Sequence, residues 1–195
     1  MNLSFSIATE ADAPALAALH TTVAEDLTRR FGRGPWSSAT SERGMLFGMR
    51  HSRVVIARKG KGIVGTFRLA TKKPWAIDVS YFTPAKKPLY LTHMAVTPTL
   101  QRQGIGSILL QEAVKQGRAW PADAIRLDAF DAVAGAGGFY AKCGLREVGR
   151  VTYRKAPLIY FELGLSTAPN SSKSLREAKT FDNRASRARL DMRGI

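Results

Sequence analysis

Cysteine, acidic side chains and long apolar runs are all scarce in this chain of 195 residues. The single Cys143 excludes an intramolecular disulfide and fits a reducing compartment, so we expect the protein in the cytoplasm. No run of about 18 apolar residues occurs, which argues against a membrane span. Residues 1–14 lack a basic start followed by an apolar core, so no secretory signal is expected.

Basic residues outnumber acidic ones by 30 to 15, which gives the chain a net charge of +15. Residues 166–195 hold seven of the basic and three of the acidic residues, so most of the surplus belongs to the residues before them. Such a surplus attracts polyanions such as nucleic acid or phosphorylated metabolites. Ordinary solubilising lysine and arginine explain it equally well, so charge alone selects no partner.

Length and a hydrophobic content of 45% favour one domain with a buried core, which we expect over residues 1–165. The composition changes after that point. Residues 166–174 (STAPNSSKS) are linker-like, and the remainder is arginine-rich with few large apolar residues. We therefore expect residues 166–195 to be a basic tail that is either disordered or a docking segment.

Residues 90–114 (YLTHMAVTPTLQRQGIGSILLQEAV) are predicted to form a buried strand, a turn at Pro98, a glycine-containing loop and a helix. Gly104 and Gly106 allow the loop to turn sharply and to approach another group closely. The N-terminus of the following helix offers unpaired N–H groups and a positive dipole end, which suit a phosphate. The loop lacks the Gly-Lys-Ser/Thr of a Walker loop and the third glycine of a Rossmann fingerprint.

This stretch resembles motif A of the GNAT superfamily of acyl-CoA-dependent N-acyltransferases, Gln/Arg-x-x-Gly-x-Gly/Ala between a strand and a helix. The match is Gln101-x-x-Gly104-x-Gly106. A second match lies at residues 139–145 (FYAKCGL), which are similar to the F/L-Y-x-K-x-G-F pattern that follows the family's fifth strand. Together the two motifs span roughly residues 88–165, with looser agreement towards the N-terminus.

The periodicity of the chain agrees with the fold that this resemblance implies. The expected strands are residues 3–7, 53–58, 63–70, 90–96, 124–130, 145–154 and 157–165. The expected helices run from about residue 9 to 30, from a cap at Ser38 or Thr40, from residue 105, and from 134 to 142. Residues 71–88 are expected to be a loop, with Trp75 to Val79 as either a strand or a short helix. The result is an α/β, GNAT-like three-layer fold, with a mixed, mostly antiparallel central sheet and helices on both faces.

The resemblance also implies the donor half of the site. The backbone N–H groups that follow the strand should hold the CoA pyrophosphate, and the strand end should pair with the pantetheine arm. Tyr140 should be the general acid for the leaving thiolate. The less favoured alternative is an amphipathic ring packed at a helix end with its hydroxyl in water. The cofactor-binding residues expected on this basis are Met94, Ala95, Val96, Gln101, Arg102, Gln103, Gly104, Ile105, Gly106 and Ser107.

The general base is less well defined. Tyr90 and Thr92 lie where relatives carry acidic or histidine bases, and neither is a strong base. His93 has a suitable ordinary pKa of about 6.5, but alternation places it on the opposite strand face unless a bulge re-aims it, so a structural role is favoured. Asp78 could bind a cationic amine or act through water, and Asp128 is expected to be a sheet or turn partner. A water chain alone would also serve.

Three further positions carry no expected chemistry. Cys143 has no histidine nearby in sequence and is interpreted as an inert thiol. His20 and His51 show no metal-ligand spacing, so no metal is predicted. An asparagine that often contacts pantetheine in the family would fall at Val133, which has no amide.

The sequence therefore predicts an N-acetyltransferase that moves an acetyl group from acetyl-CoA, its co-substrate, directly to a primary amine of a small molecule. The acceptor pocket should be lined by Thr71–Pro88, the first helical region and Arg150–Pro157. The basic surplus favours a small amine with a negative group over a polycation. One alternative is an acyl-CoA sensor without turnover. A nucleic-acid-binding protein is another, but it lacks a recognition motif. Nothing in the sequence indicates an oligomeric state.

Overall fold

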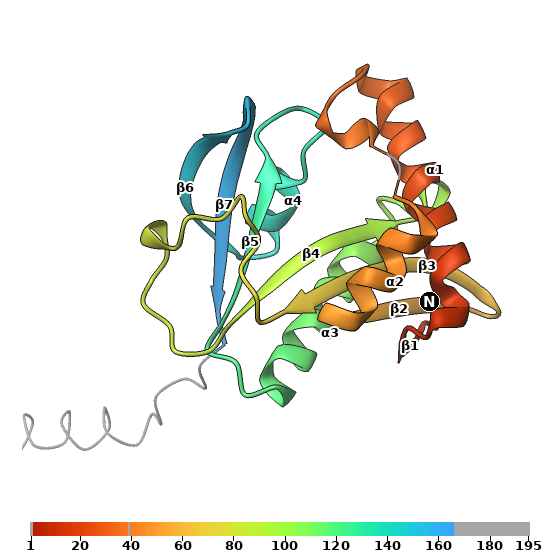
Figure 1. Cartoon of the computed structure of the whole chain (residues 1–195), viewed down its shortest axis with the longest axis horizontal. Helices are drawn as coiled ribbons and strands as arrows, with labels where there is room; N and C mark the ends of the chain where they lie inside the picture. The colour runs from red at the N-terminus through yellow and green to blue at the C-terminus, as the bar shows by residue number, and fades with distance from the viewer. Residues whose placement is uncertain (1, 39, 166–195) are drawn as a thin grey trace, which may run out of the picture. The chain divides into compact units, whose positions relative to one another are not determined.

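A computed structural model describes residues 2–38 and 40–165, so the expected tail at 166–195 lies outside the described residues. The described chain contains one sheet of seven strands in the order β1-β2-β3-β4-β5-β7-β6 (Figure 1). Its strands are β1 (Ser4–Ile7), β2 (Arg53–Lys59), β3 (Gly62–Ala70), β4 (Pro88–Val96), β5 (Ala124–Phe130), β6 (Arg146–Tyr153) and β7 (Ala156–Gly164).

The sheet is mixed but mostly antiparallel, as predicted. The β4–β5 pair is parallel, and every other pair is antiparallel. The parallel pairing is short, because it joins only Pro88 to Ala124, Leu89 to Ile125 and Tyr90 to Arg126. Beyond these residues β4 and β5 diverge, which Figure 1 shows as a V between the two arrows.

Helices cover both faces of the sheet. The two faces are visible on β2, where Val55 and Ala57 join the core that includes α3 (Ile105–Ala119), while Val54 and Ile56 join the core of the opposite face. That opposite face is covered by α1 (Ala13–Phe31) and α2 (Glu42–His51) (Figure 1). The short α4 (Gly137–Lys142) contributes Tyr140 to the core on the α3 side. The predicted three-layer fold is confirmed.

Local signals explain most helix ends. Pro14 stands in the first turn of α1, where its missing N–H costs nothing, and the helix ends at Gly32 with φ of 78°. The predicted cap of the second helix was wrong, because Ser41, rather than Ser38 or Thr40, accepts a hydrogen bond from the Gly44 N–H at 3.2 Å. The helix predicted from residue 134 begins only at Gly137.

Residues 71–87 form an irregular loop with one short 3-10 turn, η3 (Val79–Tyr81), and no strand at residues 75–79. Ile77 is fully buried in this loop and packs in a cluster with Phe82 and Tyr160. The Tyr160 hydroxyl donates to the Ala76 carbonyl and accepts from the Asp78 N–H at 3.1 Å. The loop is therefore held against β7 by packing and hydrogen bonds together.

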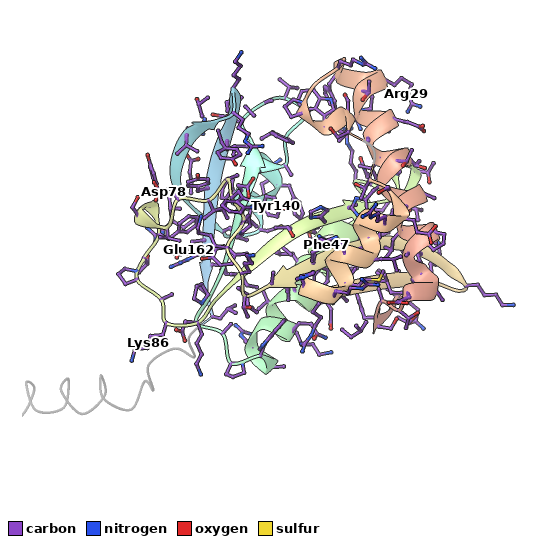
Figure 2. The ribbon with its side chains drawn as sticks, in the orientation of Figure 1. Arg29, Phe47, Asp78, Lys86, Tyr140 and Glu162 are labelled. Atoms are coloured by element: carbon purple, nitrogen blue, oxygen red, sulfur yellow. The ribbon has the colours of Figure 1, made fainter. Side chains whose placement is uncertain are left out.

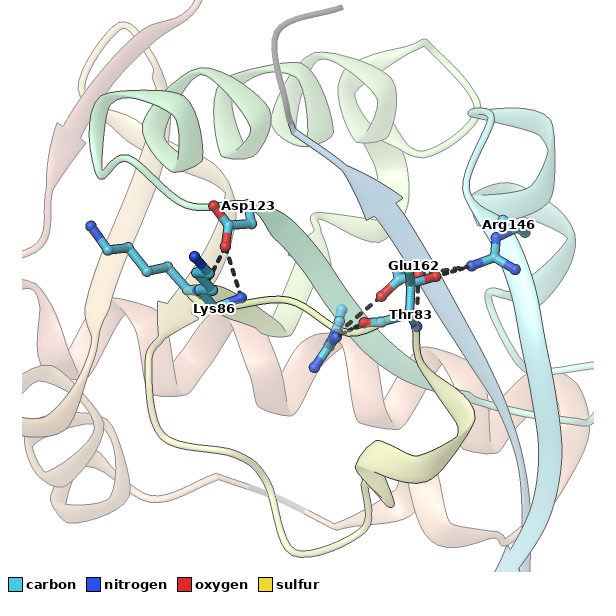
Figure 3. Close-up of polar contacts among 7 residues, drawn as sticks. Thr83, Lys86, Asp123, Arg146 and Glu162 are labelled. Atoms are coloured by element: carbon cyan, nitrogen blue, oxygen red, sulfur yellow. Dashed lines mark hydrogen bonds and ion pairs between the residues drawn. The ribbon is translucent and has the colours of Figure 1, made fainter. Parts of the chain in front are cut away.

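A buried ionic network holds the far end of the same loop (Figure 3). Glu162 of β7 pairs with Arg126 at 3.1 Å and with Arg146 at 2.9 Å. Arg126 also donates to the Thr83 carbonyl, and the Thr83 N–H donates to Glu162 at 3.3 Å. Asp123 accepts from the main-chain N–H of Lys86 at 2.8 Å, which is also drawn in Figure 3. These contacts hold residues 83–86 of the loop against β5 and β7.

Among the described residues, no helix is both long and apolar enough to cross a bilayer.

Candidate functional site

The loop before α3 has the geometry of an anion site. Gly104 precedes the helix with φ of 83°, a left-handed conformation that glycine adopts without strain, and Arg102 has φ of 60°. The first N–H groups of α3, at Ile105, Gly106 and Ser107, have no acceptor within the helix. Gly106 has a packing role as well, because a Cβ there would lie 3.2 Å from the Phe139 ring of α4. The loop thus presents main-chain donors at a positive helix end.

Two amide side chains of the predicted loop brace it from within. Gln101 donates from Nε2 to the Val96 carbonyl at 3.2 Å, and Gln103 donates to the Thr99 carbonyl at 3.2 Å. Both amides were expected to bind the cofactor. In this structure Gln101 holds the loop to the end of β4, and Gln103 holds it to the 3-10 turn η4 (Pro98–Leu100).

The strand before the loop has an open edge. β4 continues to Val96 and β5 to Phe130, but their pairing ends at Tyr90 and Arg126. From Leu91 onward β4 has described hydrogen-bonded pairing only with β3. The main chain of residues 94–96 therefore has no described partner strand on the β5 side (the β4–β5 gap), although the Val96 carbonyl accepts from Gln101, and an edge of this kind can pair with an extended ligand.

Tyr140 points at this gap from the α4 side. Its hydroxyl lies 3.7 Å from the Met94 sulfur, and its ring packs against Phe139 and Phe161 with centroid distances of 5.1 and 5.9 Å. Burial raises the pKa of Tyr140, and the nearby Asp128 and Cys143 raise it further. The phenol therefore remains protonated at neutral pH and can donate a proton or a hydrogen bond.

A bulge in β4 re-aims His93. Thr92 pairs with Arg68 and Ala95 pairs with Thr66, so two residues of β4 face the single Phe67 of β3. His93 has φ of 51°, and its ring meets the ring of His20 on α1 at 5.9 Å. The expectation from strict alternation was therefore wrong, because His93 lies on the α1 face.

The environment keeps His93 uncharged. Its side chain stays partly exposed, so partial loss of water rather than full burial is the main cause that lowers its pKa. Arg68 and His20 add a positive environment, and together these effects bring the pKa to about 4. His93 is thus a neutral imidazole at physiological pH and a weak base.

Asp128 lies within the sheet, where it pairs in register with Tyr160 of β7. It is half-buried, and after burial its charge adds to the raised pKa of both Tyr140 and Tyr160. Within the described part of the chain it has no cation within 4.0 Å. Burial raises the pKa of Asp128 itself. An acidic residue inside a strand that reads as buried core was the available signal, but it did not distinguish a site residue from a sheet partner.

The remaining candidates are less favourably placed. Asp78 is exposed and accepts hydrogen bonds from the Ser80 N–H at 3.0 Å and the Ser80 hydroxyl at 2.8 Å, which lower its pKa. Figure 2 shows Asp78 on the η3 turn, away from Tyr140. Tyr90 is 3% exposed within an apolar cluster, whereas Thr92 is half-buried beside the bulge. Val133 is 90% exposed, so this position offers only its main chain.

A cavity of about 550 Å³ lies between α3 and α4, next to the glycine loop. Three cations, Lys115, Arg118 and Lys142, line it together with Ser107 and Cys143. Cys143 lies 3.7 Å from the Ser107 hydroxyl. In residues 2–38 and 40–165, no three histidine, cysteine or acidic side chains lie close enough to hold a metal ion.

Comparison with known proteins agrees with this geometry. Residues 20–145 match the family model described as "Acetyltransferase (GNAT) family". No curated protein sequence matches the chain.

Solved structures of similar fold include the ribosomal-protein-S18-alanine N-acetyltransferase from Escherichia coli (TM-score 0.64, 15% identity, 87% of this chain and 97% of that one). Another is an aminoglycoside 6'-acetyltransferase type Ii (TM-score 0.62, 16% identity, 85% and 99%). A third is an acetyltransferase-like protein from Salmonella typhimurium, solved with its cofactor acetyl-CoA (TM-score 0.61, 15% identity, 88% and 99%). At these identities the likeness shows the fold.

Proposed function

Because the chain belongs to the GNAT acetyltransferase family, we propose that it transfers an acetyl group from acetyl-CoA directly to a primary amine of a small molecule. The observation that carries the proposal is the convergence of three features at the β4–β5 gap. These are the open edge of β4, the N-terminus of α3 and the protonated hydroxyl of Tyr140.

The residues at the gap fit acetyl-CoA as the co-substrate. The N–H groups of residues 105–107 are free to bind a pyrophosphate, and the edge of β4 is free to pair with the amides of a pantetheine arm. The cations of the α3–α4 cavity offer a place for a further phosphate. The Salmonella typhimurium protein of similar fold was solved with its cofactor acetyl-CoA, which supports the assignment.

The chemistry follows from the groups at the gap. The amine nitrogen attacks the thioester carbonyl, a C–N bond forms and the C–S bond breaks. Tyr140 gives its proton to the leaving sulfur, and Asp128, directly or through water, accepts the proton that the amine loses. Burial raises the pKa of the Asp128 carboxyl group, whereas the pKa of His93 is lowered to about 4.

The acceptor of this protein cannot be assigned from the proteins of similar fold. Two of the similar structures are a ribosomal-protein-S18-alanine N-acetyltransferase and an aminoglycoside 6'-acetyltransferase. One fold therefore serves chemically different amines, and the acceptor has to be argued from the residues of this chain.

Replacing Tyr140 with Phe tests the proposal. We expect kcat with an amine acceptor to fall by at least about tenfold because the leaving thiolate loses its acid, while KM for acetyl-CoA stays within about threefold. The measurement is thiol release from acetyl-CoA with a panel of amines. Binding of CoA without turnover on any amine would instead identify a sensor.

A further inference from the structure

Arg68 is a charged side chain without a counter-charge. It lies on β3 opposite Thr92 of β4, and its guanidinium is pressed against α2, because a Cβ on Gly48 would lie 2.1 Å from Nη2. Its Nε is buried and has no hydrogen-bond partner. Among the described residues no carboxylate lies within 4.0 Å of the group. A buried donor of this kind is costly unless something binds it.

The other arginines on the inner strands are all satisfied. Arg126 of β5 pairs with Glu162, and Arg58 of β2 pairs with Asp12. Arg53 of β2 bonds to Gln116 at 3.1 Å and lies over the Trp120 ring at 4.2 Å. The fold therefore supplies partners for strand arginines as a rule, which makes Arg68 the exception to be explained.

The surroundings of Arg68 favour an anion. Burial, followed by the charge of Arg68, lowers the pKa of both His20 and His93 to about 4. Both imidazoles are therefore neutral and add no charge beside the guanidinium. A planar guanidinium binds a carboxylate or a phosphonate through two parallel hydrogen bonds.

Arg68 also lies beside the reaction site. It neighbours the bulge that carries His93, and the next residue, Met94, is in contact with Tyr140. Adjacent strands are separated by about 4.8 Å, and β3 neighbours β4, so the Arg68 backbone is one strand away from the β4–β5 gap. Asp128 of β5, across that gap, is likewise half-buried and has no cation within 4.0 Å among the described residues.

We infer that Arg68 binds an anionic group of the acceptor, so that the substrate is a small amine that carries a carboxylate or a phosphonate. This inference rests on the proposed function. The amine of such an acceptor lies near Asp128 and Tyr140 and its anion lies on Arg68, so one molecule supplies the counter-charge for both unpaired groups. Gly48 leaves the space that the guanidinium occupies.

Matched acceptors test the inference on the full-length wild-type protein. Thiol release is measured with an amino acid, its carboxamide and the aminoalkylphosphonate of equal length, over a set of side chains. We expect kcat/KM to be at least about tenfold higher with the preferred anion than with the carboxamide, because the uncharged analogue leaves Arg68 unpaired. The comparison between the first and the third acceptor identifies which anion is bound.

The variant Arg68→Gln should abolish this preference while KM for acetyl-CoA stays within about threefold. Arg68→Lys should restore part of it, because an ammonium keeps the charge but lacks the two-pronged geometry. Arg53→Gln, a half-buried arginine on the neighbouring strand, should leave the preference unchanged. A preference that survives in Arg68→Gln overturns the inference.

A second measurement needs no turnover. The imidazole NMR signals of His20 and His93 are titrated with the same amino acid in the presence of CoA, and anion binding should raise the pKa of both rings. A rise in the wild type without acetylation of any amine would leave the anion site standing and overturn the proposed function. Acetylation without a preference for anionic amines would overturn the anion site and leave the proposed function standing. If no rise in the histidine pKa and no acetylation are observed, both proposals are overturned.

Discussion

β5 carries two charged residues, Arg126 and Asp128, and only Arg126 has a described counter-charge. Arg126 and its partner Glu162 are both about 5% exposed, whereas Asp128 has no described cation within 4.0 Å. Burial raises the pKa of Asp128, so the folded state holds its proton more tightly than the unfolded state does. This stabilisation is complete below the unfolded pKa of about 3.9 and is lost as the pH rises through the folded pKa. At neutral pH the ionised Asp128 therefore opposes folding.

Asp128→Asn should accordingly separate stability from activity. We expect the free energy of unfolding to rise at pH 7 and to change less at pH 3.5, and kcat/KM to fall by at least about tenfold as the proton acceptor is lost. Denaturant unfolding at pH 7 and at pH 3.5, together with thiol release, measures both effects. Glu25→Gln on the exposed side of α1 is the control. A variant that is less stable at pH 7 and fully active would make Asp128 a sheet partner, as the sequence alone suggested.

At the scale of an element, the N-terminus of α3 depends on the left-handed Gly104. A Cβ added at Gly104 would have no neighbouring atom within 4 Å, so the variant Gly104→Ala causes no steric clash. Its cost is the backbone strain of a left-handed alanine, about 1–2 kcal/mol. Relief of that strain should turn the first N–H groups of α3 away from the pyrophosphate and raise KM for acetyl-CoA several-fold. Gly60→Ala, with φ of 60° in the β2–β3 turn, carries equal strain far from the loop and should leave KM unchanged. Equal KM values in both variants would contradict the phosphate assignment.

The Glu162 network should show the opposite pH behaviour to Asp128. Burial alone would raise the pKa of Glu162, but hydrogen bonds from Thr83, Arg126 and Arg146 outweigh it and hold the pKa below its usual value. The stability it contributes is therefore present above the unfolded pKa of about 4.3 and is lost as the pH falls through the folded pKa.

Glu162→Gln should leave Arg126 without its counter-charge. We expect a loss of about 3 kcal/mol at pH 7 and a smaller loss near pH 3, where the wild-type carboxylate is protonated. Glu147→Gln removes an exposed pair with Arg150 and should cost at most about 1 kcal/mol. Urea unfolding at the two pH values measures this difference. A loss of unfolding free energy that is the same at both pH values would argue against an ionic origin.

At the scale of the whole molecule, the sequence was most informative where a signal is local. The glycine loop, the helix starting at Ile105 and the antiparallel strands follow from spacing and periodicity, and they appeared as predicted. Alternation alone predicted the wrong strand face for His93. The bulge that re-aims this residue depends on how β4 pairs with β3, and periodicity along one strand does not reveal that pairing. Arg68 escaped notice because its lack of a partner is a property of α1, α2 and β4 together.

The extent of the catalytic unit gives the last prediction. The family model matches residues 20–145, and the three solved structures named above align over 97–99% of their own length with 85–88% of this chain. A chain ending at Leu165 should therefore keep its melting temperature, and its kcat/KM should stay within about twofold.

The same truncation also tests whether the basic surplus of the last 30 residues contributes to any binding of nucleic acid. It removes seven basic and three acidic residues, which lowers the net charge from +15 to +11, so any binding of duplex DNA at low salt should weaken. A chain ending at residue 155, which lacks β7 and with it the partner of both β5 and β6, is the control that should fail to fold. Loss of turnover in a folded 165-residue chain would contradict the prediction and show that the last 30 residues contribute to activity.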